Sequence, residues 1–293
     1  MMDILYSGNR IVSTGKMLVE IFREIGLMYE YKHKIMKLEE QISEKRPVLI
    51  AFSGGIDSIL LAIITKNILG NDHLCVLIDS LLVPEDDVER ARKIAREYDL
   101  KLMIVDYDPL SIPEVKQNSK DRCYHCKKGI CNILKKIALE HNIETIMDGT
   151  NTSDLGEYRP GNRATYEEGV EHPFVDTGIT KDDIRTIAKD MDLKIWNLPS
   201  SACLASRIPY NETIEPAMLE IIDKGESFLH GLGFEKCRLR LHNNGKLSRI
   251  EVPKDMFEAL ICKRSTILNH LRSLGVQFVT MDMSGYKSGS FDN

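Results

Sequence analysis

The sequence predicts an α/β protein in which a parallel sheet carries helices on both faces, followed by a small α+β domain. From Pro47 onward, short apolar runs alternate with amphipathic stretches, a rhythm typical of parallel sheets. Two glycines directly follow the first apolar run, and after about Arg207 the rhythm changes to helix, two alternating strands, helix and strand. We therefore expect an N-terminal helical extension over 1–46, the α/β domain over 47–208, and a substrate or assembly domain over 209–293.

The elements follow from local patterns. Residues 17–45 repeat apolar side chains at helical spacing and predict an amphipathic helix that packs on its own domain. The expected strands of the α/β domain are PVLIAF, HLCVLIDS, KLMIVDY and TIMDGTN, and its helices are SILLAIITKNIL, PEDDVERARKIAREYD, GICNILKKIALEHN and TKDDIRTIAKDMD. In the small domain, helix EPAMLEIIDKGESFLHGLG precedes the hairpin KCRLRLH–NNGK–SRIEVP, and helix DMFEALICKRSTILNHLRSLG and strand VQFVTMDM follow it.

Composition limits the partners. The 293 residues carry a net charge of −5, which gives no global attraction to nucleic acid. The longest apolar run, PVLIAF, is too short to span a bilayer, and the first residues lack a signal-peptide pattern. Seven cysteines, an odd number, favour the reducing cytosol over a disulfide framework. We expect a cytoplasmic protein without nucleic-acid or membrane partners, and a homo-oligomer is possible.

The stretch AFSGGIDS lies where a buried strand turns into a helix. The N–H groups of Gly54 and Gly55, together with the helix dipole, can hold an anion. The hydroxyls of Ser53 and Ser58 add donors, and Asp57 could hold Mg²⁺. A plain glycine turn is the alternative. The motif resembles the pyrophosphate loop (PP-loop) of the N-type ATP pyrophosphatases, which implies that ATP adenylates an oxygen of the substrate and releases pyrophosphate.

This resemblance extends to other positions. It implies that Asp79, at the end of the second strand, lies near the nucleotide, although a loop-capping carboxylate is an alternative. Lys181 begins a helix, where the dipole disfavours an ordinary lysine, so we expect a pyrophosphate contact. The polar loop that holds Asp154, Tyr158 and Arg159 follows a strand and should be functional.

Longer stretches narrow the family. RCYHCK, DGTNTSDLGEYRPG, TKDDIRTIAKDMDLKIWNLPSSACLASRIPY and MDMSGYKSGS resemble LarE-type sulfur transferases of nickel-pincer cofactor biosynthesis, and the likeness covers roughly residues 47–293. It implies an ATP-dependent sulfurtransferase that adenylates a carboxylate of a pyridinium dicarboxylate mononucleotide and replaces oxygen by sulfur, releasing AMP and pyrophosphate. Arg238 and Arg240 share one face of a strand and could clamp the substrate phosphate. A solvated basic edge is the alternative.

The sulfur source depends on three cysteines. Cys203 occupies the position at which some family members surrender their own sulfur, but here Cys123 and Cys126 accompany it. Three thiolates can bind a [4Fe–4S] cluster and leave one iron open for a hydrosulfide, which sulfide or another donor would replace. Arg122 and Lys127 flank the pair and suggest a setting that favours thiolates. A sacrificial Cys203 and a structural zinc completed by His125 remain alternatives.

We expect Cys131 and Cys75 to be packing residues. Cys131 lies on the apolar side of a helix and Cys75 within a buried strand, and neither Cys237 nor Cys262 has a partner at ligand spacing. Two other function classes remain open: a tRNA thiolase of the same superfamily, which the acidic net charge disfavours, and a non-catalytic ATP-binding module.

Overall fold

The computed structural model describes residues 31–156, 160–198 and 202–287. Its larger part holds a parallel sheet of β1 (Val48–Ala51), β2 (His73–Asp79), β3 (Leu102–Asp106) and β4 (Thr145–Met147), in the order β3-β2-β1-β4. The strand order reverses between β1 and β4. The loop after β1 therefore opens at the switch point where sheets of this kind bind ligands.

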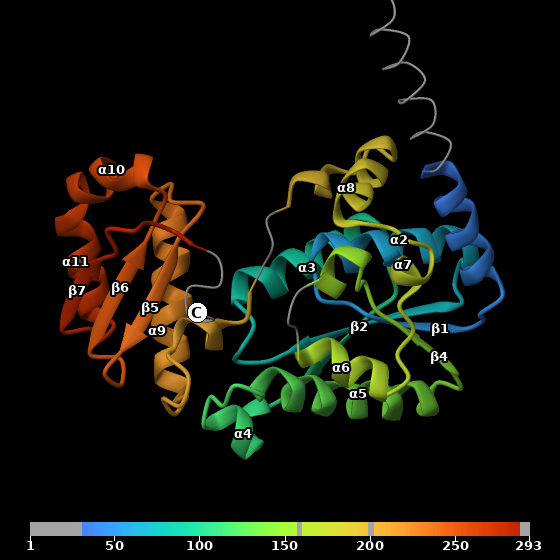
Figure 1. Ribbon diagram of the computed structural model, residues 1–293, viewed down its shortest axis with the longest axis horizontal. Coiled ribbons are helices and arrows are strands. Elements are labelled where there is room, and N and C mark those ends of the chain that lie inside the picture. Colours follow the sequence, from blue (N-terminus) through green and yellow to red (C-terminus); the bar gives the residue numbers. More distant parts are fainter. Residues whose placement is uncertain (1–30, 157–159, 199–201, 288–293) are drawn as a thin grey trace, which may run out of the picture.

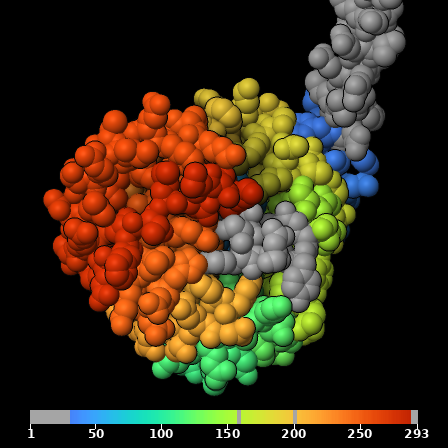
Figure 2. Space-filling view, turned by 60° about the vertical axis from the view of Figure 1, so that its left-hand side comes forward, coloured from blue at the N-terminus to red at the C-terminus, as the bar shows by residue number. Residues whose placement is uncertain are grey.

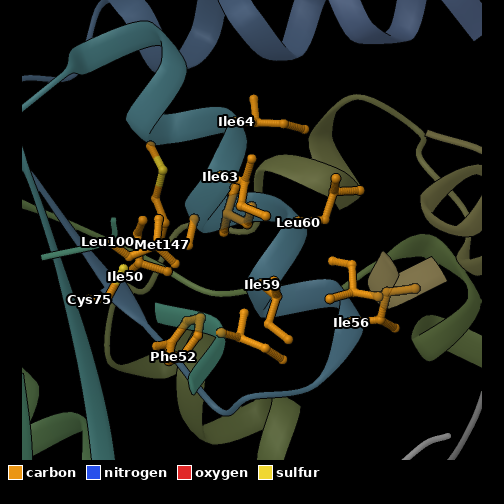
Figure 3. Packing of buried hydrophobic residues seen from close by; sticks show 14 of the residues in the cluster. Ile50, Phe52, Ile56, Ile59, Leu60, Ile63, Ile64, Cys75, Leu100 and Met147 are labelled. Atoms are coloured by element: carbon orange, nitrogen blue, oxygen red, sulfur yellow. The ribbon is translucent and has the colours of Figure 1, made fainter. Parts of the chain in front are cut away.

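Helices cover both faces of this sheet, as the sequence predicts. Figure 1 shows α2 (Ile56–Leu69), α3 (Glu85–Glu97) and α8 (Lys181–Asp190) on one side and α5 (Arg122–Glu140) with α6 (Pro160–Glu167) on the other. Side chains alternate along each strand, so Ile50 and Cys75 join the core under α2, while Leu49 and Leu74 join the core under α5. Figure 3 shows the first core, where side chains of α2 meet those of β1 and β2.

The described part of the N-terminal extension packs on this domain. Residues 31–43 are helical, and Leu38 and Ile42 are fully buried in the core under α2. Lys34 forms an ion pair with Asp183 of α8 at 3.0 Å. The expected packing is confirmed for this part, and residues 17–30 of the predicted helix lie outside the described residues.

Short elements that the hydrophobic pattern did not predict connect the larger ones. They are η1 (Pro109–Ser111), α4 (Pro113–Lys116), η2 (Thr152–Gly156), α7 (Pro173–Asp176), η3 (Lys194–Asn197) and η4 (Leu204–Arg207). Each has at most five residues, which is too short for a periodicity to show.

The C-terminal part is a three-stranded mixed sheet with helices. It contains α9 (Pro216–Gly231), β5 (Arg238–His242), β6 (Leu247–Glu251), η5 (Lys254–Met256), α10 (Phe257–Cys262), α11 (Arg264–Ser273) and β7 (Phe278–Met281). β5 and β6 form the predicted antiparallel hairpin, with Asn243, Asn244 and Gly245 at positive φ in its turn, and β7 pairs parallel to β6. The single helix predicted over residues 255–275 is divided at Lys263 into α10 and α11.

An apolar core joins the two parts. Leu82 and Val115 of the α/β part belong to the same buried cluster as Leu204, Ile208 and the side chains of α9 and β5. Figure 2 shows the segment after Cys203, in light orange, lying against the green segment that leads into α5. In the part of the chain that the structure describes, no helix is long and apolar enough to cross a membrane.

Candidate functional site

The loop between β1 and α2 is held in shape by its own hydrogen bonds. Ser58 Oγ accepts from the Ser53 N–H at 3.1 Å and donates to the Gly55 carbonyl at 3.0 Å. Gly54 has a φ of +73°, and a Cβ there would lie 2.8 Å from Cβ of Ala91 in α3. Glycine is therefore required at this position for two reasons, the positive backbone angle and the close contact with α3.

A second loop presses on the first. A Cβ on Gly149 would lie 2.7 Å from the Ser58 nitrogen and 2.8 Å from the Asp57 carbonyl carbon. Its neighbour Asp148 is 5% exposed and accepts hydrogen bonds from His172 Nδ1 at 2.7 Å and from the Thr150 N–H at 2.9 Å. Burial by itself raises the pKa of Asp148, but the His172 hydrogen bond, the charges of Lys127 and His172 and the Thr150 N–H outweigh it and lower the pKa.

A cavity of about 400 Å³ opens beside the β1–α2 loop and brings together residues from six segments of the chain. Its walls unite phosphate-binding candidates with thiols: they include Ser53, Gly55, Asp57, Cys126, Lys127, Asp154, Lys181, Arg185 and Cys203. Half of the site residues predicted from the sequence thus line this cavity, whereas Gly54, Ser58, Cys123, Asp79, Arg238 and Arg240 are not among its lining residues. Tyr158 and Arg159, predicted to belong to the same loop as Asp154, lie outside the described residues.

Asp79 faces a different space. It lines a neighbouring cavity of about 870 Å³, and its Oδ2 lies 3.5 Å from Arg92. Ser80 and Val83 border both cavities, so the two adjoin. The nucleotide contact expected of Asp79 stays a prediction, and the residue already has a cationic partner.

The start of α8 borders the cavity through two basic residues. Thr180 and Asp183 form a capping box around Lys181, which exposes the positive end of the helix dipole toward this side. Arg185 donates to the carbonyls of Trp196 at 2.6 Å and Leu198 at 3.1 Å. Arg185 is therefore more than the simple surface charge that its helix position suggests, because it fixes the segment that leads toward Cys203.

Cys123 and Cys126 lie in the first turns of α5, which begins at Arg122 rather than at the predicted Gly129. Cys126 and Cys203 line the same cavity, and Cys123 lies three residues before Cys126 on the same helix. Among the residues that the structure describes, no three His, Cys, Asp or Glu side chains converge as ligands of a single metal ion do. The three sulfurs thus share one neighbourhood without meeting at one point.

The pKa is raised for both thiols that border the cavity, those of Cys126 and Cys203. Burial raises the pKa of Cys126 to about 12, and the charges of Cys203 and Cys123 add to this, while Lys127 and Arg122 oppose it. The basic neighbours thus act on Cys126 in the expected direction, but burial outweighs them and the pKa is raised overall. Cys203 lines the cavity and its surface is exposed. Loss of solvation within the surrounding protein nevertheless raises the pKa of its thiol. The Ala205 N–H and the charges of Arg122 and Arg207 oppose that rise.

Asn118 brings Cys203 to the start of α5. This residue is fully buried with a φ of +53°, and its Nδ2 donates to the carbonyls of Ile208 at 3.1 Å and Pro209 at 2.7 Å. The Ile214 N–H also donates to the Lys116 carbonyl at 2.7 Å. These bonds close a long stretch of chain and hold the cysteine-bearing segments side by side.

Arg207 then fixes the backbone around Cys203. It is 2% exposed, and its Nη1 donates to the carbonyls of Ala202 at 2.7 Å and Cys203 at 2.9 Å. Its Nε and Nη2 donate to the two oxygens of Glu226 at 3.0 and 2.7 Å, and Glu226 also accepts the Leu239 N–H. We did not predict this network from the sequence. A local sign of it was the position of Arg207, a charged residue directly before the apolar Ile208.

A second buried arginine lies beside the cysteines. Arg122 is 7% exposed, and its guanidinium lies 4.5 Å from the ring centre of Tyr210. Its Nε and Nη1 are buried and have no hydrogen-bond acceptor among the described residues. From the sequence, Arg122 was predicted only to contribute to a basic setting for the thiols.

Arg238 and Arg240 differ in their surroundings. Arg240 is 4% exposed, and it donates to Glu251 at 2.5 Å and to the Ser206 carbonyl at 2.8 Å. A solvated basic edge is therefore excluded for Arg240. Arg238 stacks 5.2 Å from the ring centre of Tyr286, and burial lowers the pKa of its guanidinium. The phosphate clamp stays a prediction.

Of the other cysteines, Cys75 and Cys131 pack in apolar cores as predicted. Cys75 and Cys237 are fully buried and Cys131 is 1% exposed, each within an apolar core. Cys262 is exposed.

Comparison with known proteins first defines the class. The NAD synthase family model matches residues 28–139. The glutamine-hydrolysing GMP synthase of Borrelia garinii is 26% identical over 141 residues, which cover 47% of this chain and 26% of that protein. Together with the parallel sheet and its glycine loop, these matches define a member of the PP-loop ATP pyrophosphatase superfamily.

Several relatives match most of the chain, and two of them are described here. The pyridinium-3,5-bisthiocarboxylic acid mononucleotide synthase of Lactiplantibacillus plantarum is 30% identical over 253 residues, which cover 86% of this chain and 91% of that protein. An uncharacterized protein of Methanocaldococcus jannaschii is 33% identical over 258 residues, covering 87% and 98% respectively. The chain belongs to the LarE family of ATP-dependent sulfur-inserting enzymes.

Proposed function

We propose that this chain adenylates a carboxylate of a pyridinium dicarboxylate mononucleotide and replaces its oxygen by sulfur. The observation that most supports this is the single cavity whose walls hold both the glycine-loop side chains Ser53 and Asp57 and the thiols of Cys126 and Cys203. The name of the Lactiplantibacillus relative describes a product with two thiocarboxylates on a pyridinium mononucleotide.

The first step uses the glycine loop. The N–H groups of Gly54 and Gly55 and the Ser53 hydroxyl bind the pyrophosphate portion of ATP, with Lys181 adding a positive charge. Asp57 is the expected ligand of a Mg²⁺ ion that bridges the phosphates. An oxygen of the substrate carboxylate attacks the α-phosphorus, pyrophosphate leaves, and the product is an acyl adenylate, whose AMP is a far better leaving group than a carboxylate oxygen.

The second step exchanges the leaving group for sulfur. A sulfur nucleophile attacks the acyl carbon, and AMP departs with the electron pair of the broken C–O bond, so no oxidant or reductant is consumed. We assign the sulfur to a [4Fe–4S] cluster on Cys123, Cys126 and Cys203, which when bound would supply a replaceable inorganic sulfur atom. Three thiols are available for such a cluster: Cys126 and Cys203 line one cavity, and Cys123 lies three residues before Cys126 in the first turns of α5. Binding of iron would require the thiols of Cys126 and Cys203 to lose their protons, which their raised pKa values oppose.

The C-terminal part orients the substrate. Arg238 is the better of the two candidates for a contact to the substrate phosphate, since Glu251 and the Ser206 carbonyl already bind Arg240. Arg207 and Glu226 join the Cys203 segment to Leu239 of β5. The same set of hydrogen bonds would thus position both Arg238, which contacts the substrate phosphate, and Cys203, which lies beside the sulfur.

The test is pyrophosphate release by anaerobic protein reconstituted with iron and sulfide. We expect release that requires the pyridinium mononucleotide, continues over several turnovers with added sulfide, and is accompanied by cluster absorption. Cys123→Ala should lose the absorption and the repeated turnovers, while Cys262→Ala, at an exposed cysteine of the other part, should keep both. Dependence on tRNA would contradict the substrate assignment. Mass spectrometry that finds one hydrogen sulfide equivalent lost from Cys203 would identify a sacrificial donor.

A further inference from the structure

Arg122 carries a buried positive charge with unused hydrogen-bond donors. Its exposed fraction is 7%, and Nε and Nη1 have no acceptor among the described residues. No carboxylate of the described chain lies within 4.0 Å of it as an ion-pair partner. A buried guanidinium in this condition is costly unless something else neutralises it.

The surroundings of Arg122 add positive potential. It is the first residue of the nineteen-residue helix α5, where the free N–H groups of the first turn already disfavour a cation. The side chain of Asp121, the residue before it, makes no capping hydrogen bond. The start of α5 thus combines two sources of positive potential and suits an anion.

Tyr210 holds the guanidinium in place. Cζ of Arg122 lies over the ring of Tyr210, 4.5 Å from the ring centre. The ring stabilises the cation but offers no lone pair to its N–H groups in the way that a carboxylate does. The contact with Tyr210 therefore leaves the unused donors of Arg122 unsatisfied.

The nearest chemistry is that of the sulfurs. Arg122 directly precedes Cys123 at the start of α5. Tyr210, which covers Arg122, belongs to the segment that follows Cys203, and Asn118 holds that segment through the carbonyls of Ile208 and Pro209. An anion carried between these thiols would therefore lie within the field of the guanidinium.

We propose that Arg122 is an anion-binding residue that holds the negatively charged sulfur group next to Cys203. The chemical class is a small sulfur anion, either free hydrosulfide or the inorganic sulfide of a bound cluster. The identity of this anion rests on the proposed function, whereas the presence of an anion site at Arg122 does not.

The experiment compares two alkylating reagents on anaerobic, iron-free full-length protein. Iodoacetate is an anion and iodoacetamide is neutral, so the ratio of their rates at one thiol reports anion binding beside it and cancels the reactivity of the thiol itself. Rates at Cys203 are measured by peptide mass spectrometry and divided by those at the exposed Cys262 of the same chain. In Arg122→Gln we expect the iodoacetate-to-iodoacetamide ratio at Cys203 to fall about tenfold.

Arg163→Gln is the matched control. Arg163 also stacks on a tyrosine, with 4.2 Å to the ring centre of Tyr124, but its side chain is 62% exposed and pairs with Glu167. We expect no change of the ratio in this variant. An unchanged ratio in Arg122→Gln with a wild-type thermal midpoint would overturn the proposal.

Two further measurements keep the outcomes separate. If Arg122→Gln does not fold, Arg122→Lys keeps the charge and should retain the wild-type ratio within about threefold; a ratio no higher than at Cys262 would contradict the anion site. Hydrosulfide titration of reconstituted protein, followed by cluster absorption, should need about tenfold more sulfide in Arg122→Gln. A wild-type protein that forms no cluster but shows the alkylation effect contradicts the proposed sulfur source and leaves the anion site supported.

Discussion

The two arginine environments around Cys203 differ in one property. In the Cys203 segment, each guanidinium nitrogen of Arg207 has an acceptor, and the carboxylate of Glu226 balances its charge. At the start of α5, Arg122 is almost equally buried, with 7% against 2% exposed, but Nε and Nη1 have no acceptor among the described residues. Burial alone therefore does not separate a structural cation from one that awaits a ligand. The hydrogen-bond partners do.

Removing the charge of Glu226 should give the largest loss of stability. Glu226→Gln keeps the shape of the side chain but leaves Arg207 buried without its counter-charge, and such a loss costs about 3–5 kcal/mol of the free energy of unfolding. Denaturant titration measures it. Glu220→Gln on the same helix, where the pair with Lys224 is exposed, is the control and should not change the free energy measurably. Equal effects of the two variants on the free energy of unfolding would contradict the conclusion that Glu226 neutralises the buried charge of Arg207.

The second comparison is between the buried pair of Asp148 and His172, beside the β1–α2 loop, and the pair of Arg207 and Glu226. Because the pKa of Asp148 is lowered in the folded protein, its stabilisation is present above the unfolded pKa of about 3.9 and is lost as the pH falls through the folded pKa. Asp148→Asn should therefore cost about 1.5–3 kcal/mol near pH 7 and progressively less toward pH 3. Unfolding curves of both proteins at several pH values measure this.

Asp223 provides a control of opposite sign. Burial, together with the charges of Asp86, Glu85 and Glu226, raises its pKa against the opposing Glu85 N–H. Its contribution to stability is thus present at low pH and lost as the pH rises through the folded pKa. Asp223→Asn should be at least as stable as the wild type near pH 7. A shared pH trend for the two variants would contradict the assignment of Asp148.

Arg122→Gln should have the smallest effect on stability, with a reversed sign. Since no carboxylate of the described chain neutralises this guanidinium, its removal relieves a buried charge, and the free energy of unfolding should stay within about 0.5 kcal/mol or increase. Denaturant titration of iron-free protein checks this. A loss as large as that of Glu226→Gln would mean that Arg122 is structural like Arg207, and the contrast between the two regions would disappear.

Sequence patterns were sufficient for the elements that local hydrophobicity specifies. The runs around Leu49 and Val76 identified parallel strands because such strands are buried on both faces. The glycine loop was recognised because its residues occur at a strand–helix junction, and Cys131 was assigned to packing from its place on the apolar side of a helix. These features depend on neighbours within a few residues.

Features that depend on distant contacts were missed or predicted wrongly. Nothing local to Arg122 shows that Tyr210 covers it, and nothing near Cys126 shows that the apolar core of the C-terminal part buries its thiol. The break at Lys263 escaped notice because the apolar spacing continues through it. Hydrophobic periodicity describes which face is buried, whereas the state of a thiol or a guanidinium depends on the groups that the tertiary fold places against it.

The Asn118 link has a consequence for how the chain can be divided. Cys123 and Cys126 come from the first part of the sequence and Cys203 from a segment much farther along, and the bonds from Asn118 to Ile208 and Pro209 join them. Two separately produced fragments, separated between α8 and Cys203, would each carry an incomplete set of thiols. If the proposed cluster forms, iron uptake after mixing would report the reassembly of the two fragments.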